Sequence, residues 1–137
     1  IRDVSLSRGL GDVYKRQQDA CAFYENQGIY KEFSGVVEEV NEGDEIAKAL
    51  GDKKVAILQN HGILTTGPSV DIALWFYMSM ERCCQAQLMA EAAGEPISVS
   101  HEIAVKTREF IANDIAAWAS YQPAFDKIVK MQPDLLD

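Results

Sequence analysis

The sequence predicts an α/β domain, because short apolar segments typical of strands stand beside long segments with helical spacing. Residues 53–59 form a nearly continuous apolar run, as expected for a strand covered on both faces. Residues 63–66 form a second, shorter strand. Residues 69–93 repeat their apolar positions with helical spacing and make the longest element. The strands precede the helices without a regular βαβ repeat.

Three shorter elements are predicted upstream of this region. The apolar runs at 20–24 and 34–37 indicate short strands. Asp44 can cap a helix that runs through Leu50, and Gly51 stops it.

The helix at 69–93 has clear start and stop signals. Ser69 can cap it, Asp71 is favourable in its first turn, and Gly94 ends it. Its first half is apolar around most of its circumference, which predicts burial on two sides, one against the sheet and one against a neighbouring subunit. The spaced apolar positions are Val70, Ala73, Leu74, Tyr77, Met80, Cys84 and Leu88.

Two more helices are predicted towards the carboxyl end. The first starts near Ser100 and ends before Pro123, and a short terminal helix covers 125–131.

The amino-terminal residues resemble a translated sequencing adapter. Residues 7–17 read SRGLGDVYKRQ, a run that a transposase-type adapter sequence encodes codon by codon. The alternative is a natural basic arm. We therefore expect residues 1–17 to be a disordered, non-native segment, and 18–137 to be the carboxyl-terminal part of a single domain truncated at its amino terminus.

The charge balance excludes one class of partner. Of 13 basic and 21 acidic residues, the first 17 positions hold four and two, so 18–137 carries nine against nineteen. Such an acidic surface repels phosphate backbones, which argues against nucleic acid. No apolar stretch reaches the length of roughly 18 residues that a membrane span needs.

The three cysteines point to a reducing compartment. Cys21, Cys83 and Cys84 form no C-x-x-C pattern, and adjacent helical positions face different directions. We expect free thiols that serve packing, and a cytoplasmic protein.

His61 is the main candidate for chemistry. It lies in Asn60-His61-Gly62, between the two predicted strands, where Gly62 favours a tight reversal. An imidazole in such a turn can bind a divalent metal, or it can simply stabilise the turn. The spacing alone leaves both interpretations open, and the stabilising one is the more common.

The other candidates have ordinary explanations. His101 is expected to be solvated in a first helical turn. The carboxylates between Glu38 and Glu45 match no calcium-loop pattern and are expected on a solvated surface. Tyr24 and Tyr30 can line a pocket or pack as core or interface aromatics.

Several motifs together resemble the class II aldolase/adducin family. They are ILQNHGILTTG at 57–67, SVD at 69–71, MERCCQAQL at 80–88 and DACAFY at 19–24. The resemblance covers essentially 18–137. It implies a three-layer α/β/α fold with a largely antiparallel central sheet, assembled into homo-oligomers, usually tetramers, with sites at subunit boundaries.

The resemblance also implies a metal. Active members hold zinc through a His-x-His pair and a later histidine, and His61 occupies the position of that later histidine. The His-x-His pair and the acid/base glutamate belong to an upstream half that this sequence lacks. Zinc is therefore expected in the full-length parent, although another divalent metal would also suit the site.

Two function classes follow from the resemblance. The first is a fragment of a zinc-dependent lyase or epimerase that acts on a small sugar or sugar phosphate through a metal-stabilised enediolate, and that is inactive as it stands. The second is an adducin-like non-catalytic module that binds proteins of the actin cytoskeleton. The missing upstream ligands decide between them, so whether the chain belongs to an enzyme stays open.

Overall fold

The computed structural model describes residues 18–32 and 40–136, so the predicted strand at 34–37 lies outside the described residues. The described part alternates short strands with helices of very different length. In chain order the elements are η3 (Asp19–Phe23), β1 (Gln27–Tyr30), α1 (Val40–Leu50), β2 (Val55–Leu58), β3 (Gly62–Thr65), α2 (Val70–Ala93), α3 (His101–Ile111), α4 (Asp114–Met131) and η4 (Pro133–Leu136).

The α/β fold class is confirmed, but the sheet in the described residues is mixed. Its order is β1-β2-β3, with β1 parallel to β2 and β2 antiparallel to β3. The expected largely antiparallel sheet is thus corrected for these strands. The connection from β1 to β2 contains α1, which gives the chain room to cross back and run parallel. Only residues 59–61 join β2 to β3, and so short a link forces an antiparallel pair.

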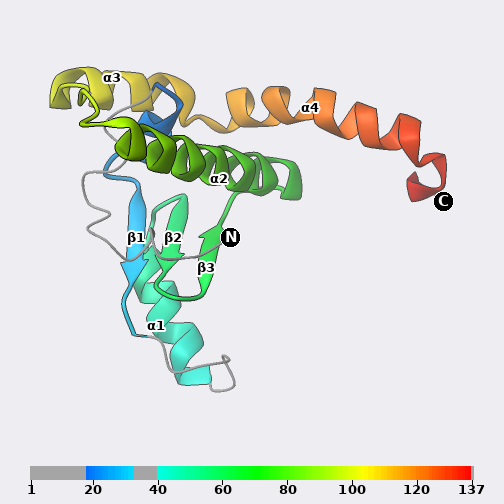
Figure 1. Cartoon of the computed structure of the whole chain (residues 1–137). Helices are drawn as coiled ribbons and strands as arrows, with labels where there is room; N and C mark the ends of the chain where they lie inside the picture. The colour runs from blue at the N-terminus through cyan, green and yellow to red at the C-terminus, as the bar shows by residue number, and fades with distance from the viewer. Residues whose placement is uncertain (1–17, 33–39, 137) are drawn as a thin grey trace.

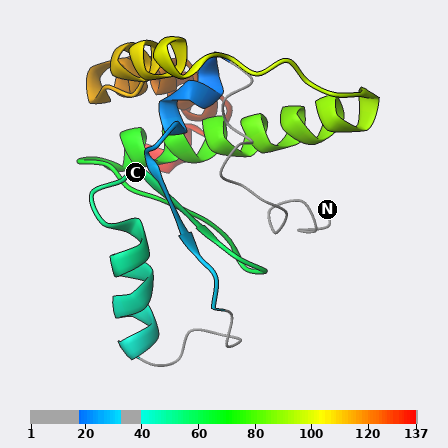
Figure 2. The same cartoon turned by 90° about the vertical axis from the view of Figure 1, so that its left-hand side faces the viewer.

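The helices divide unevenly between the two ends of the strands. Helix α1 packs against β1 and β2, whereas α2 packs against β3 and η3. Figures 1 and 2 show α2 crossing the end at which β1 and β2 begin, with α3 beside it. The β2–β3 turn lies at the opposite end, away from these helices.

The core forms where β2 meets η3 and α2. All four residues of β2 are buried, which confirms the prediction of a strand covered on both faces. The ring of Phe23 meets the ring of Phe76 edge-on, with centroids 6.2 Å apart. Met80 and Ile57 complete this cluster with no exposed surface. These contacts anchor α2 across the sheet.

Helix α2 has the predicted ends. The Ser69 hydroxyl accepts a hydrogen bond from the Ile72 amide at 3.5 Å, and Gly94 ends the helix at φ 156°. Only one stripe of the helix is buried within the described chain. Four of the predicted apolar positions are exposed there: Val70, Leu74, Tyr77 and Leu88.

Residues 20–24 do not form the predicted strand. Residues Asp19–Phe23 form a 3₁₀ helix, closed by bonds from the Cys21 amide to the Gln18 carbonyl and from the Tyr24 amide to the Cys21 carbonyl, each 3.1 Å. The prediction of burial is correct, since Ala20 to Phe23 are buried. A run this short and uniformly apolar carries no periodicity that separates helix from strand.

The helix boundaries near the carboxyl end also differ from expectation. The break lies at Asn113 instead of Pro123, because the Asn113 side chain caps α4 by accepting from the Ala116 amide at 2.8 Å. Pro123 lies inside α4, where it lacks the amide hydrogen that would bond the Ala119 carbonyl. Helix α1 begins at Val40, before the predicted cap at Asp44.

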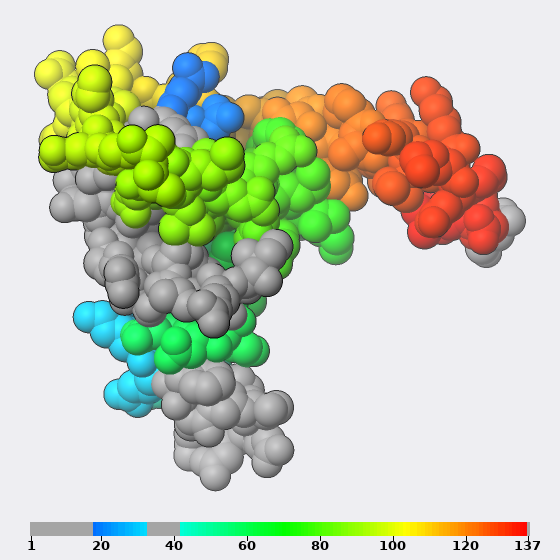
Figure 3. All heavy atoms as spheres, in the orientation of Figure 1, coloured from blue at the N-terminus to red at the C-terminus, as the bar shows by residue number. Residues whose placement is uncertain are grey.

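The end of α4 extends from the body as an arm. Its first part packs against α2, and its remainder projects outward in Figure 3. Within the described ranges, no helix combines the length and the apolar character that a bilayer crossing needs.

Candidate functional site

His61 lies in the tight turn that joins β2 to β3. Its amide donates to the Leu58 carbonyl at 3.0 Å, and Leu58 pairs with Gly62 across the strands. The predicted reversal is confirmed, but the residue that makes it is different. Asn60 takes the left-handed conformation at φ 61°, whereas Gly62 does not. Asparagine tolerates this region better than most residues with a Cβ.

The turn presents the His61 side chain outward. The residue is exposed, and its backbone is fixed between two paired strands. The carboxyl end of β1 is fixed beside the turn, because the Gln59 amide donates a hydrogen bond to the Tyr30 carbonyl at 2.9 Å. The imidazole is therefore accessible on a rigid support, as a metal ligand should be.

Carboxylates lie near Tyr30, at the carboxyl end of β1. Loss of hydration raises the pKa of Tyr30, and the nearby carboxylates of Glu42, Glu32 and Glu45 raise it further. Glu42 also accepts a hydrogen bond from the Tyr30 hydroxyl. One of these carboxylates, Glu45, is paired with the ammonium of Lys48.

The described residues do not complete a metal site. Among 18–32 and 40–136, no three His, Cys, Asp or Glu side chains are placed to hold an ion together. The donor set on hand therefore fits only one position of a zinc site, which needs three protein ligands for catalysis. No chemical step through a metal follows from this chain.

His101 lies at the opposite end of the molecule. It is the first residue of α3, and its Nδ1 is 2.7 Å from the Tyr24 hydroxyl and 3.9 Å from Glu25 Oε1. The imidazole is 68% exposed, as predicted for a solvated residue, yet it also meets the Tyr24 ring edge-on. The two histidines do not form one site.

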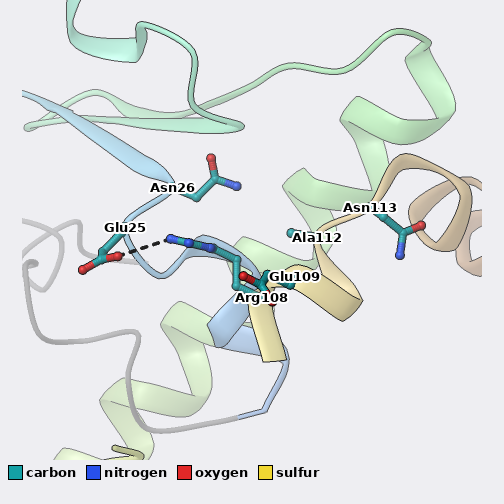
Figure 4. A pocket seen from close by; sticks show the side chains of 6 residues that line it. All are labelled: Glu25, Asn26, Arg108, Glu109, Ala112 and Asn113. Carbon is teal, nitrogen blue, oxygen red and sulfur yellow. Dashed lines mark hydrogen bonds and ion pairs between the residues drawn. The ribbon is translucent and has the colours of Figure 1, made fainter. Parts of the chain in front are cut away.

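A polar pocket of about 280 Å³ lies beside this contact (Figure 4). Arg108, in the last turn of α3, points at Glu25, and its Nη1 donates to Glu25 Oε2 at 3.4 Å and to the Tyr24 carbonyl at 2.9 Å. Glu25 itself has a left-handed backbone, at φ 55°. The bonds join α3 to the segment before β1.

The amides that line this pocket are already engaged. Asn26 donates to the Ala22 carbonyl at 3.3 Å and accepts from the Lys54 amide at 3.2 Å. Asn113 caps α4 and donates to the Phe110 carbonyl at 2.6 Å. We interpret the pocket as a structural joint between η3, β2 and α3. Sequence reasoning missed it, because its members are spread between residues 22 and 113.

The packing role predicted for the three cysteines is confirmed by their positions in the buried clusters. All three are buried, and none of them is joined in a disulfide within the described residues. Burial, with smaller contributions from the carboxylate of Asp19 and the neighbouring thiols, raises the pKa of Cys83 to about 12. Cys83 therefore remains a thiol at neutral pH, and a thiol is a poor nucleophile and metal ligand.

The model of the family described as Class II Aldolase and Adducin N-terminal domain matches residues 5–88. The match includes η3, the whole sheet and most of α2, and the His61 turn lies within it. It begins inside the segment that we interpret as adapter-derived, and the boundary at residue 18 stays a prediction.

Curated relatives include two Streptomyces enzymes. Decarboxylase NovR from Streptomyces niveus is 37% identical over 118 residues, which cover 86% of this chain and 44% of that protein. The 4-hydroxy-3-prenylphenylpyruvate oxygenase/4-hydroxy-3-prenylbenzoate synthase from Streptomyces roseochromogenus is 36% identical over the same length, 86% of this chain and 43% of its own. Human gamma-adducin is 26% identical over 89 residues, which cover 64% of this chain and 13% of that protein.

A solved structure shares the fold. L-fuculose 1-phosphate aldolase from Glaciozyma antarctica superposes with a TM-score of 0.80 at 32% identity, covering 96% of this chain and 48% of that one. The chain thus spans less than half the length of these relatives.

Proposed function

Because the chain belongs to the class II aldolase and adducin family, we propose that it forms part of a zinc-dependent carbon–carbon lyase or epimerase. The substrate class we favour is a small sugar or sugar phosphate, in keeping with the fuculose 1-phosphate aldolase that shares the fold. The proposed protein is a cytoplasmic homo-oligomer with a small-molecule substrate.

One observation carries the proposal: an exposed imidazole on a rigid two-strand turn, inside the segment that the family model matches. His61 would supply one zinc ligand from this turn. Its other ligands and the acid/base group would lie outside the described residues. Bound zinc would act there as a Lewis acid that stabilises an enediolate.

Zinc content tests the ligand assignment. We would express the protein extended upstream to the length of its relatives and measure bound zinc by elemental analysis. We expect about one zinc per subunit, lost in His61→Ala and kept in His101→Ala. His101 is the other histidine of the chain, so it makes a matched control. Zinc that survives His61→Ala would refute the assignment.

The adducin-like module is the second candidate. Gamma-adducin aligns at 26% identity, so the family alone does not exclude a non-catalytic role. The two Streptomyces enzymes align at higher identity over a longer stretch, which favours an enzyme. A zinc-free extended protein that cosediments with actin filaments would support the adducin-like role instead.

The same relatives raise an alternative substrate class. One of them is named for prenylated aromatic acids, which differ from sugar phosphates in lacking a phosphate and in carrying a large apolar group. Parallel assays of the extended protein with fuculose 1-phosphate and with a 4-hydroxy-3-prenylphenylpyruvate substrate would separate the two classes.

A further inference from the structure

A second hollow lies on the helical side of the molecule, away from the His61 turn. Its volume is about 280 Å³, and η3, α2, α4 and the end of α3 line it. Small side chains create it: Ala22, Ser79, Ala116 and Ser120 face the space where larger residues would fill it. Ala116 and Ser120 are one helical turn apart and thus share a face of α4.

Aromatic rings form the wall of this hollow. Trp75 and Phe76 come from α2, and Phe110, which is 79% exposed, forms the outer edge. Aromatic faces attract cations, and one ring here already does so. The ammonium of Lys54 lies 5.5 Å from the Phe76 centroid and is neutralised by Asp114 at 2.6 Å.

Apart from the indole N–H of Trp75, the polar side-chain groups of the hollow are a carboxylate and two hydroxyls. Asp19 is the one charged residue among those that line it, and Ser79 and Ser120 add two hydroxyls. Within the described part of the chain, these three side chains make no hydrogen bond or ion pair with one another or with other residues. The hollow therefore offers a negative charge and hydroxyl oxygens beside aromatic surface.

We propose that this hollow binds a small primary ammonium compound with an apolar body. The ammonium has three donors for the carboxylate and hydroxyl oxygens, and the body lies against Trp75 and Phe110. Asp19 would repel an anion, and an uncharged apolar molecule would gain no attraction from that exposed carboxylate. The volume is at the lower limit of ligand pockets, which restricts the guest to a single ring with a short chain.

The test uses Trp75 as its reporter. The chain has two tryptophans, and Trp118 does not line the hollow, so Trp118→Phe leaves Trp75 as the sole tryptophan. In this background we would titrate the full chain with phenethylamine and with the uncharged 2-phenylethanol. We expect saturable binding of phenethylamine at least about fivefold tighter than binding of 2-phenylethanol.

Variants test separately the contribution of the Asp19 charge and that of the volume of the hollow to binding. Asp19→Asn should remove the preference for the amine, whereas Asp126→Asn, an exposed acid elsewhere on α4, should leave it unchanged. Ala116→Leu should fill the hollow and abolish binding of both compounds, with circular dichroism to verify that the helices persist. Equal affinity for the two compounds, no saturable binding, or loss of the preference in Asp126→Asn would each overturn the proposal. None of these measurements depends on zinc.

Discussion

The two ends of the sheet differ in how their polar groups are used. Where β1 and β2 begin, α2 packs against β3 and η3, α3 packs against η3, and Arg108, Glu25 and Asn26 bond to one another or to the backbone. Where β2 ends, a short turn presents the exposed His61, and carboxylates lie near Tyr30 at the end of the neighbouring strand β1. The described core is concentrated at the covered end, whereas the His61 side chain is exposed.

The largest expected effect concerns the covered end. Phe76→Ala should lower the free energy of unfolding by about 3–5 kcal/mol, because it removes a fully buried ring from the contact between α2 and η3. Phe110→Ala is the matched control, since this ring is mostly exposed and should cost less than about 0.5 kcal/mol. Urea denaturation of both variants measures the difference, and similar losses would contradict the assignment of Phe76 to the core at the covered end.

A pH effect of intermediate size should come from Cys83. Its folded-state pKa of about 12 is above the ordinary value of 9.0, so the folded state favours the protonated thiol. This contribution is complete below pH 9 and is lost as the pH rises from about 9 towards 12. From pH 8 to pH 10 the loss should be about 1 kcal/mol.

Urea unfolding at the two pH values, with Cys83→Ala alongside, isolates this contribution. The comparison is needed because the pKa values of Cys21 and Tyr30 are also raised and act in the same direction. Identical pH dependence in the variant would show that Cys83 is not the cause.

The smallest effect is expected at the turn. His61→Ala should change the free energy of unfolding by less than about 0.5 kcal/mol, because the side chain is exposed. Asn60→Ala, one residue earlier, should cost about 1 kcal/mol, since alanine is strained at φ 61°. Thermal unfolding of the pair provides the measurement. A larger loss for His61→Ala than for Asn60→Ala would assign His61 a structural role.

The sequence predicted those features that depend on local signals. Ser69 and Gly94 bound α2 as expected, and the uniformly apolar β2 is buried. The parallel pairing of β1 with β2 was not predicted, since it depends on where a crossover returns the chain. Likewise, Asn113 and Pro123 are both plausible helix boundaries, and the structure uses the one whose side chain caps the next helix.

Only the part of the candidate site that depends on local sequence signals was predictable. The position of His61 follows from a tripeptide between two apolar runs, whereas the joint around Arg108 combines residues that no periodicity connects. Its bond to Tyr24 spans 84 residues, and the bond between Tyr24 and His101 spans 77.

The 84-residue separation between Tyr24 and Arg108 determines how long η3 waits for its partner helix during synthesis. A ribosome that adds about 5–20 residues per second needs roughly 4–17 seconds to proceed from Tyr24 to Arg108. The apolar residues Ala20 to Phe23 are complete at the start of this interval, but their cover from α3 does not yet exist. The β2–β3 hairpin closes across three residues and needs no such delay. During synthesis, a chaperone therefore has more time to bind η3 than to bind the β2–β3 hairpin.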